Sequence, residues 1–222
     1  MPWTGTAIGA VQIYNVRQID LMIDRQRFEL IRGKHGAYGS WAVWASPSGA
    51  PKSHVGDLRV FDQQANAGLL DTLNPGVVMV GLNISRGFPD EPFRNFHDAG
   101  ASANDFKIRY AFSGTSFWGA YMTDIIKGVV EPDSGALVNW LRRNRQVIVE
   151  HVKAFRSELS DLGQPRPVIL AFGGAAHNLL VENLPARDYA HLVRMTHYSH
   201  RISKEKYRET VHEQLRALPG TA

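Results

Sequence analysis

The stretch GVVMVGLNIS, residues 76–85, is a run of apolar residues that ends in a small polar loop. A short apolar run without polar alternation is typical of a strand that is covered on both faces, as in a parallel sheet. Asn83 lies where this strand should end. Asparagine is commonly a turn residue at such a place, because it tolerates left-handed backbone and bonds to its own chain. Whether Asn83 does more than this depends on the residues that lie beside it.

Several other short apolar runs, rich in β-branched residues, predict further strands. The clearest of these runs lie at 119–126, 166–173 and 191–198, and an earlier run at 40–46 could be a further strand. Around them, apolar residues spaced mostly by three and four predict helices. The helices are expected at 16–33, 136–163 and 203–218. Strands that alternate with helices indicate an α/β domain with a mostly parallel sheet.

Residues that commonly end or cap helices stand at the boundaries of these helical patterns. Gly33 and Gly163 are expected to follow the last turns of the first two helices, and Ser203 is expected to cap the start of the third. No repeat, low-complexity tract or long linker divides the chain. We therefore predict a single domain over residues 1–222, in which residues 1–50 could form an accessory arm.

The composition excludes several classes of protein. The 222 residues include no cysteine, which removes disulfides, thiolate nucleophiles and cysteine-based metal sites and fits a reducing cytoplasm. The first residues carry no signal-peptide pattern, and the apolar runs are far shorter than the ~20 residues of a membrane helix. The formal charge of +4 is a mild bias that is compatible with an acidic partner such as nucleic acid. We therefore expect a cytoplasmic monomer with no membrane partner.

Polar residues follow four of the predicted strands. Because open parallel sheets bind ligands beyond the carboxyl ends of their strands, these residues should meet at one edge. They are Asn83 and Ser85, then Thr123, Asp124 and Lys127, then the glycines that open GGAAHN (173–178), and lastly THYSH (196–200). Each group also has a structural reading, as a turn, a helix cap, close packing or surface histidines. Their expected meeting at one edge favours a functional site.

Common catalytic motifs are missing from the sequence. It contains no G-x-S-x-G nucleophile elbow, no G-x-x-x-x-G-K-[ST] phosphate loop and no H-E-x-x-H zinc motif. His197 and His200, joined by His97, have a spacing that could serve a metal ion, but no matching carboxylate accompanies them. We therefore predict no metal site.

Two short motifs resemble those of the uracil-DNA glycosylase superfamily. The first is a strand ending in G-[ILM]-N-P-[GS], as in the mismatch-specific and single-strand-selective branches, and it reads GLNIS here (81–85). The second is H-P-S-P-x or N-P-S-x-x after the last strand, and it reads HYSHR here (197–201). Ile84, Tyr198 and His200 replace the prolines of these motifs.

The segments between the two motifs also resemble the superfamily, and order and spacing fit from about residue 76 to the C-terminus. YMTDIIKG (121–128) looks like its middle strand, and VILAFGGAAHNLL (168–180) looks like its strand, glycine turn and helix. The resemblance implies a three-layer α/β/α sandwich with a central, mostly parallel four-stranded sheet. It also implies an enzyme that flips uracil or another deaminated base out of DNA and hydrolyses its N-glycosidic bond without a cofactor.

The resemblance assigns roles to the residues at the sheet edge. Asn83 would hold the attacking water through its carbonyl oxygen, and His197 would donate a hydrogen bond to the base oxygen on which negative charge develops. Backbone N–H groups from Leu82 to Ser85 would assist. Asp124 would accept a hydrogen bond from N3–H of uracil.

Aromatic and basic residues near the motifs would contact the flipped base and the DNA. Phe93 is chosen over Phe88 and Phe96 as the ring that stacks on the base. Arg201 or Ile202 would fill the space that the base leaves in the duplex. The residues expected to bind DNA are Ser199, His200, Arg201 and Lys127.

Two other classes of function stay open from the sequence. The missing motif prolines are compatible with a nucleic-acid-binding relative without catalysis, because prolines pre-shape loops. An unrelated α/β hydrolase of small molecules could use His197 with Asp124 or Ser199.

Overall fold

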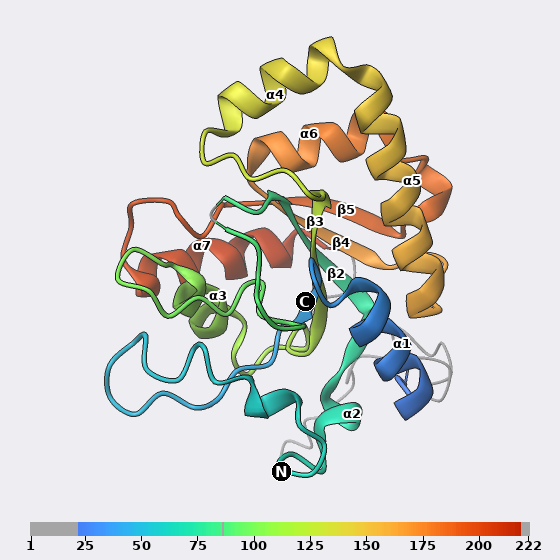
Figure 1. Cartoon of the computed structure of the whole chain (residues 1–222). Helices are drawn as coiled ribbons and strands as arrows, with labels where there is room; N and C mark the ends of the chain where they lie inside the picture. The colour runs from blue at the N-terminus through green and yellow to red at the C-terminus, as the bar shows by residue number, and fades with distance from the viewer. Residues whose placement is uncertain (1–21, 86, 219–222) are drawn as a thin grey trace, which may run out of the picture.

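The sheet at the centre of the protein has five strands (Figure 1). In the computed structural model, which describes residues 22–85 and 87–218, their order across the sheet is β1-β3-β2-β4-β5. The strands are β1 Ser40–Trp41, β2 Asn74–Asn83, β3 Ala120–Ile126, β4 Val168–Phe172 and β5 His191–Met195. The last four run parallel, whereas β1 pairs with β3 in the antiparallel direction. The expected α/β fold with a mostly parallel sheet is confirmed, but the expected count of four strands is wrong because β1 extends the sheet.

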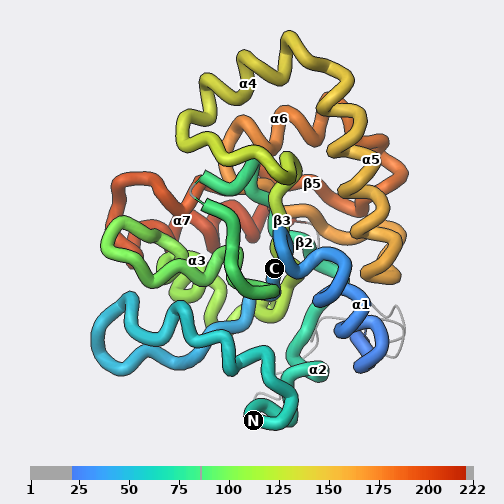
Figure 2. Tube along the Cα trace, in the orientation of Figure 1, coloured from blue at the N-terminus to red at the C-terminus, as the bar shows by residue number. Residues whose placement is uncertain are grey.

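Helices connect the parallel strands and cover the sheet. In the described residues they are α1 Arg25–His35, α2 Leu69–Thr72, α3 Asp105–Phe112, α4 Ser134–Arg143, α5 Arg145–Leu162, α6 Gly173–Asn183 and α7 Lys204–Arg216. Short 3-10 helices lie at Leu58–Phe61 and Ala186–Asp188. Along the chain, which can be followed in Figure 2, α4 and α5 connect β3 to β4, and α6 connects β4 to β5. Parallel strands of one sheet require crossover connections of this kind.

Side chains of β2 point alternately to the two faces of the sheet, as a strand dictates. Val78 and Val80 join the core that contains buried residues of α1, α4, α5 and α6. Val77 and Met79 join a second core with buried residues of α3 and α7. Because helices cover both faces, β2 is apolar from Val77 to Leu82 rather than alternately polar.

Some helix boundaries follow the sequence and one long helix does not. Gly163 ends α5 in the left-handed conformation, and the Ser203 side chain caps α7 by accepting a hydrogen bond from Lys206 N–H, so both predictions are confirmed. The helix expected at 136–163 is two helices, which separate at Asn144, where the backbone leaves the helical region.

The first helix is shorter than expected and ends later. Residues 16–21 lie outside the described part of the chain, and α1 begins after Asp24, whose carboxylate accepts a hydrogen bond from Arg27 N–H. The helix continues through Gly33 and ends at Gly36, so the prediction that Gly33 terminates it is wrong.

The described part of the expected N-terminal arm belongs to the core of the domain. Phe28, Ile31 and Trp41 are fully buried, and the predicted strand at 40–46 contributes only Ser40–Trp41 to the sheet. Among the described helices, none combines the length and apolar character that crossing a membrane requires.

Candidate active site at the carboxyl edge of the sheet

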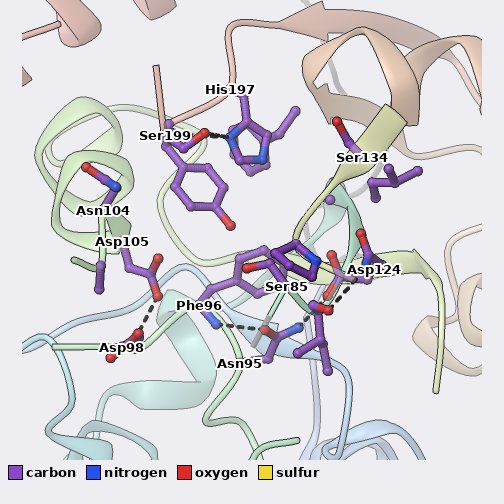
Figure 3. A pocket seen from close by; sticks show the side chains of 18 of the residues that line it. Ser85, Asn95, Phe96, Asp98, Asn104, Asp105, Asp124, Ser134, His197 and Ser199 are labelled. Atoms are coloured by element: carbon purple, nitrogen blue, oxygen red, sulfur yellow. Dashed lines mark hydrogen bonds between the residues drawn. The ribbon is translucent and has the colours of Figure 1, made fainter. Parts of the chain in front are cut away.

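A cavity of about 870 Å3 lies at the carboxyl ends of β2 and β3 (Figure 3). Asn83 and Asp124 reach it from these strands, Gly173 from the start of α6, and His197 and Ser199 from the segment after β5. Each of the four groups expected at one edge therefore contributes at least one residue to the cavity, although not all of their members line it. Figure 3 shows His197 with Ser199 on one side of the cavity, and Asp124 and Ser85 across from them.

The side-chain amide of Asn83 is fixed in one orientation. Its nitrogen lies 3.0 Å from the carbonyl oxygen of Ile84, 3.2 Å from that of Val129 and 2.9 Å from that of Glu131. Because carbonyl oxygens only accept, the amide nitrogen must face all three. The oxygen Oδ1 is left without a partner among the described residues, and Asn83 lines the cavity. Asn83 thus joins β2 to the loop after β3 and keeps one acceptor available for a water or a ligand.

Asp124 is a buried carboxyl group at the end of β3. Its side chain is held by Asn95, whose amide nitrogen lies 2.9 Å from Oδ2 and also donates to the carbonyl of Tyr38. Gly81 faces it across the β2–β3 ladder, and a Cβ atom at Gly81 would lie 2.2 Å from Oδ1 of Asp124. A side chain at Gly81 would therefore force this carboxyl group to move. Burial raises the pKa of Asp124 to about 6, against the opposing effects of Asn95 and Lys127.

The raised pKa of Asp124 predicts a pH-dependent cost to stability. The unfolded carboxyl ionises near its ordinary value of 3.8 and the folded one at about 6, so stability is lost as the pH rises through this window. Asp124→Asn keeps an acceptor for Asn95 but cannot ionise. Relative to the wild type, its free energy of unfolding should increase by about 2 kcal/mol between pH 4 and pH 7. Urea denaturation of both proteins at several pH values measures this, and a pH-independent difference would contradict it.

His197 presents a defined tautomer to the cavity. The backbone N–H of Ser199 donates to Nδ1 over 3.1 Å, and Oγ of Ser199 lies 2.7 Å from the same nitrogen (Figure 3). Since a backbone N–H only donates, Nδ1 carries no hydrogen and the neutral ring has its hydrogen on Nε2. Burial lowers the pKa of His197 to about 4, so the ring is neutral near pH 7. His197 is therefore an uncharged N–H donor.

Phe93 does not belong to the cavity. It is fully buried in the core, with ring centroids 5.4 Å from Phe28 and 5.2 Å from Phe61. The prediction that Phe93 stacks on the base is wrong. The two phenylalanines set aside in its favour, Phe88 and Phe96, both line the cavity, and Phe88 is 56% exposed.

Lys127 points into the protein and not toward DNA. Its ammonium group lies 2.7 Å from Oε2 of the fully buried Glu158 and donates to the backbone carbonyl of Asp124 over 2.6 Å. Oε1 of Glu158 accepts from the hydroxyls of Tyr121 and Thr123. The prediction that Lys127 binds a DNA phosphate is contradicted by this placement. The ion pair instead anchors the end of β3, on which Asp124 lies, to α5.

Breaking this ion pair should be costly. Glu158→Gln still accepts from Tyr121 and Thr123 but removes the ion-pair partner of the Lys127 ammonium, whose side chain is 12% exposed. We expect the free energy of unfolding to fall by about 3 kcal/mol. The double variant Lys127→Met with Glu158→Gln should recover part of this loss, as urea denaturation of the four proteins in the cycle would measure. Strictly additive losses would show that the pair is not coupled.

The other predicted site residues divide into those at the cavity and those beside it. Leu82 and Ser85 line the cavity from the end of β2, as does Ser199. His200 and Arg201 are exposed next to it but do not line it, and the carbonyl of His200 accepts from Lys107.

Several residues of the cavity were missed by the sequence reasoning. Asn95 holds Asp124, and Asp98, Asn104 and Asp105 form a polar wall at the start of α3 (Figure 3). Tyr198 lines the cavity between His197 and Ser199 in the chain. These residues lie in loops or at a loop–helix junction, where apolar periodicity gives no signal. Tyr198 is the one that the sequence singled out, because it replaces a proline of the second motif.

Neither a metal site in the described residues nor a comparison with known proteins gives further information about function. Within residues 22–85 and 87–218, no three His, Cys, Asp or Glu side chains are grouped so that they could hold a metal ion. No protein-family model matches this chain, and neither a curated protein nor a solved structure matches it. The functional interpretation therefore depends on the geometry of the cavity.

Proposed function

We propose that the protein is a monofunctional DNA glycosylase that hydrolyses the N-glycosidic bond of uracil, or of another deaminated base, flipped out of DNA. The observation that carries this proposal is the meeting of Asn83, Asp124 and His197 in one cavity. An amide oxygen without a partner among the described residues, a buried carboxyl acceptor and a neutral N–H donor are the groups this hydrolysis calls for. Four parallel strands with helices on both faces also agree with the three-layer sandwich that the resemblance implies.

Each group has one task in the proposed reaction. The bond between sugar C1′ and the base nitrogen breaks, and its electron pair moves onto the base. The N–H of His197 donates to the base oxygen that gains this charge, while Asp124 accepts the N–H of the base. Asn83 holds a water, whose oxygen bonds to C1′ and whose released proton neutralises the base anion. The products are the free base and an abasic sugar, and the only co-reactant is water.

The size of the cavity is compatible with a flipped nucleotide. Its volume of about 870 Å3 falls in the range of sites that enclose small organic ligands. Phe88 and Phe96 supply aromatic rings at its wall, and base–aromatic stacking is worth roughly 1–3 kcal/mol per base. Either ring can take the role that was assigned to Phe93.

An alkali-cleavage assay tests the proposal. The protein is incubated with end-labelled oligonucleotides that carry one uracil, as a single strand and opposite adenine or guanine, and is then treated with alkali. Strand breaks at the uracil, and none in a matched cytosine oligonucleotide, are expected. Absence of breaks in all three substrates at stoichiometric protein would refute uracil excision, and binding without breaks would favour a non-catalytic relative.

A second candidate function is favoured by the charge of the cavity. The carboxylates of its described lining are Asp90, Asp98, Asp105, Asp124 and Glu131, and the only lysine or arginine among the described lining residues is Arg94. A wall of this sign repels phosphates and suits a small uncharged or cationic substrate. The same reaction on a free nucleoside is therefore the alternative. Release of uracil from deoxyuridine, with none from the oligonucleotides, would establish it in place of the DNA glycosylase.

A further inference from the structure

Tyr198 replaces a proline of the second motif, and its ring is held rigidly at the wall of the cavity. The ring stacks on His197, with centroids 4.3 Å apart and planes at 21°. It also makes edge-on contacts with Phe172, at 5.4 Å, and with Phe96, at 6.5 Å. Three aromatic neighbours leave the phenol little freedom to turn. The position of its hydroxyl is therefore a fixed property of the fold.

The hydroxyl of Tyr198 is available to a ligand. It has no hydrogen-bond partner within residues 22–85 and 87–218, it is not among the fully enclosed polar atoms, and Tyr198 lines the cavity. Burial and the charges of Asp105 and Asp124 raise the pKa of Tyr198 well above its ordinary value, so the phenol keeps its proton at neutral pH. Asp124 lines the same cavity. The cavity thus contains both an O–H donor and a carboxyl acceptor.

We propose that Tyr198 determines base specificity by donating a hydrogen bond to the exocyclic carbonyl oxygen of the flipped base. This inference rests on the proposed glycosylase function. Asp124 accepts the adjacent ring N–H at the same time. This donor–acceptor pair matches a lactam, such as the C4 carbonyl and N3–H of uracil. Cytosine presents a bare N3 and an amino group there, so its N3 would face the Asp124 carboxylate with no hydrogen to share. A polar group left unpaired in this way is a strong source of discrimination.

The test compares two bases that differ only in the atom that Tyr198 would contact. 4-Thiouracil keeps the ring N–H but replaces the exocyclic oxygen by sulfur, which is a weak acceptor. In Tyr198→Phe we expect kcat/KM for uracil excision to fall about 10-fold, while the already lower value for 4-thiouracil falls less than about 3-fold. A merely structural role for Tyr198 would lower both values equally. Tyr110→Phe, a change on α3 outside the cavity lining, is the matched control and should leave both values unchanged.

The outcomes separate this inference from the proposed function. Thermal unfolding of Tyr198→Phe should match the wild type, because the ring and its three aromatic contacts remain. Equal losses on both bases, or no loss on either, in a protein that excises uracil would overturn the role of Tyr198 and leave the glycosylase function standing. A wild-type protein that excises neither base would overturn the proposed function, and the inference that rests on it would fall too.

Discussion

Asn83→Ala should lower the rate of uracil excision by about 100-fold, because a misplaced reactant costs about two orders of magnitude. The variant loses Oδ1, the oxygen that would hold the attacking water. It also loses the three hydrogen bonds from Nδ2 to the carbonyls of Ile84, Val129 and Glu131. Single-turnover excision assays at saturating protein measure the chemical step apart from binding of the oligonucleotide.

The structural part of this effect can be separated from the chemical part. Losing the Nδ2 bonds should lower the free energy of unfolding by about 1–3 kcal/mol, since three partly buried carbonyls lose this donor. Asn66→Ala is the matched control, because the Asn66 amide also donates to a backbone carbonyl, that of Val60, but does not line the cavity. It should lose stability and keep the full excision rate. A wild-type rate in Asn83→Ala would contradict the proposed role of this residue.

The first motif lacks its proline, yet the side chain of Asn83 is still held in place. In the motif of the resemblance a proline follows the asparagine, and here Ile84 stands in its place. Ile84 is buried, and its carbonyl is one of the three that hold the Asn83 amide. The other two carbonyls come from Val129 and Glu131, in the loop after β3. A contact between two loops therefore fixes Asn83 without the stiffness of a proline ring.

The parts of the fold that follow from local pattern could be predicted from the sequence. Strands β2 to β5 are short apolar runs, and their carboxyl ends meet because parallel strands share an edge. A strand was predicted at 40–46, but its reduction to Ser40–Trp41 and its place in the sheet were not, because pairing with β3 depends on residues far along the chain. The break between α4 and α5 was not predicted, because the helical spacing of apolar residues continues across Asn144. The backbone, however, leaves the helical conformation at that residue.

The cavity could be predicted only where a residue ends a strand. Asn83 and Asp124 were placed correctly, because strand ends are visible as the limits of apolar runs. Phe93 and Phe96 lie in an irregular loop, both with positive φ, so no period indicates which ring points outward. Lys127 looked exposed because its partner, Glu158, lies on α5, more than thirty residues later in the chain. Such pairings are a property of packing and leave no local mark.

The second large effect is expected from His197→Ala, which should lower uracil excision by about 100- to 1000-fold, the usual cost of losing a donor to developing negative charge. The reason is that Nε2–H is the hydrogen that a neutral His197 can offer once Nδ1 accepts the Ser199 N–H. His197→Gln restores an uncharged N–H donor and should recover about 10-fold of the loss. His177→Ala, on α6 and outside the cavity lining, should have no effect.

The pH profile of excision distinguishes a neutral His197 from a charged one. The pKa of His197 lies at about 4 and that of Asp124 at about 6, so of these two groups Asp124 is the one that titrates between pH 5 and pH 8. The rate should fall about 10-fold per pH unit below pH 6, as the carboxylate that accepts the base N–H is protonated, and stay level above it. An imidazolium donor would instead make the rate fall as the pH rises through about 6.5, the ordinary value for histidine. A rate that falls at alkaline pH in the wild type but not in His197→Gln would contradict the neutral state assigned to His197. A rate that stays level at alkaline pH would support an uncharged His197 as the donor to the developing anion.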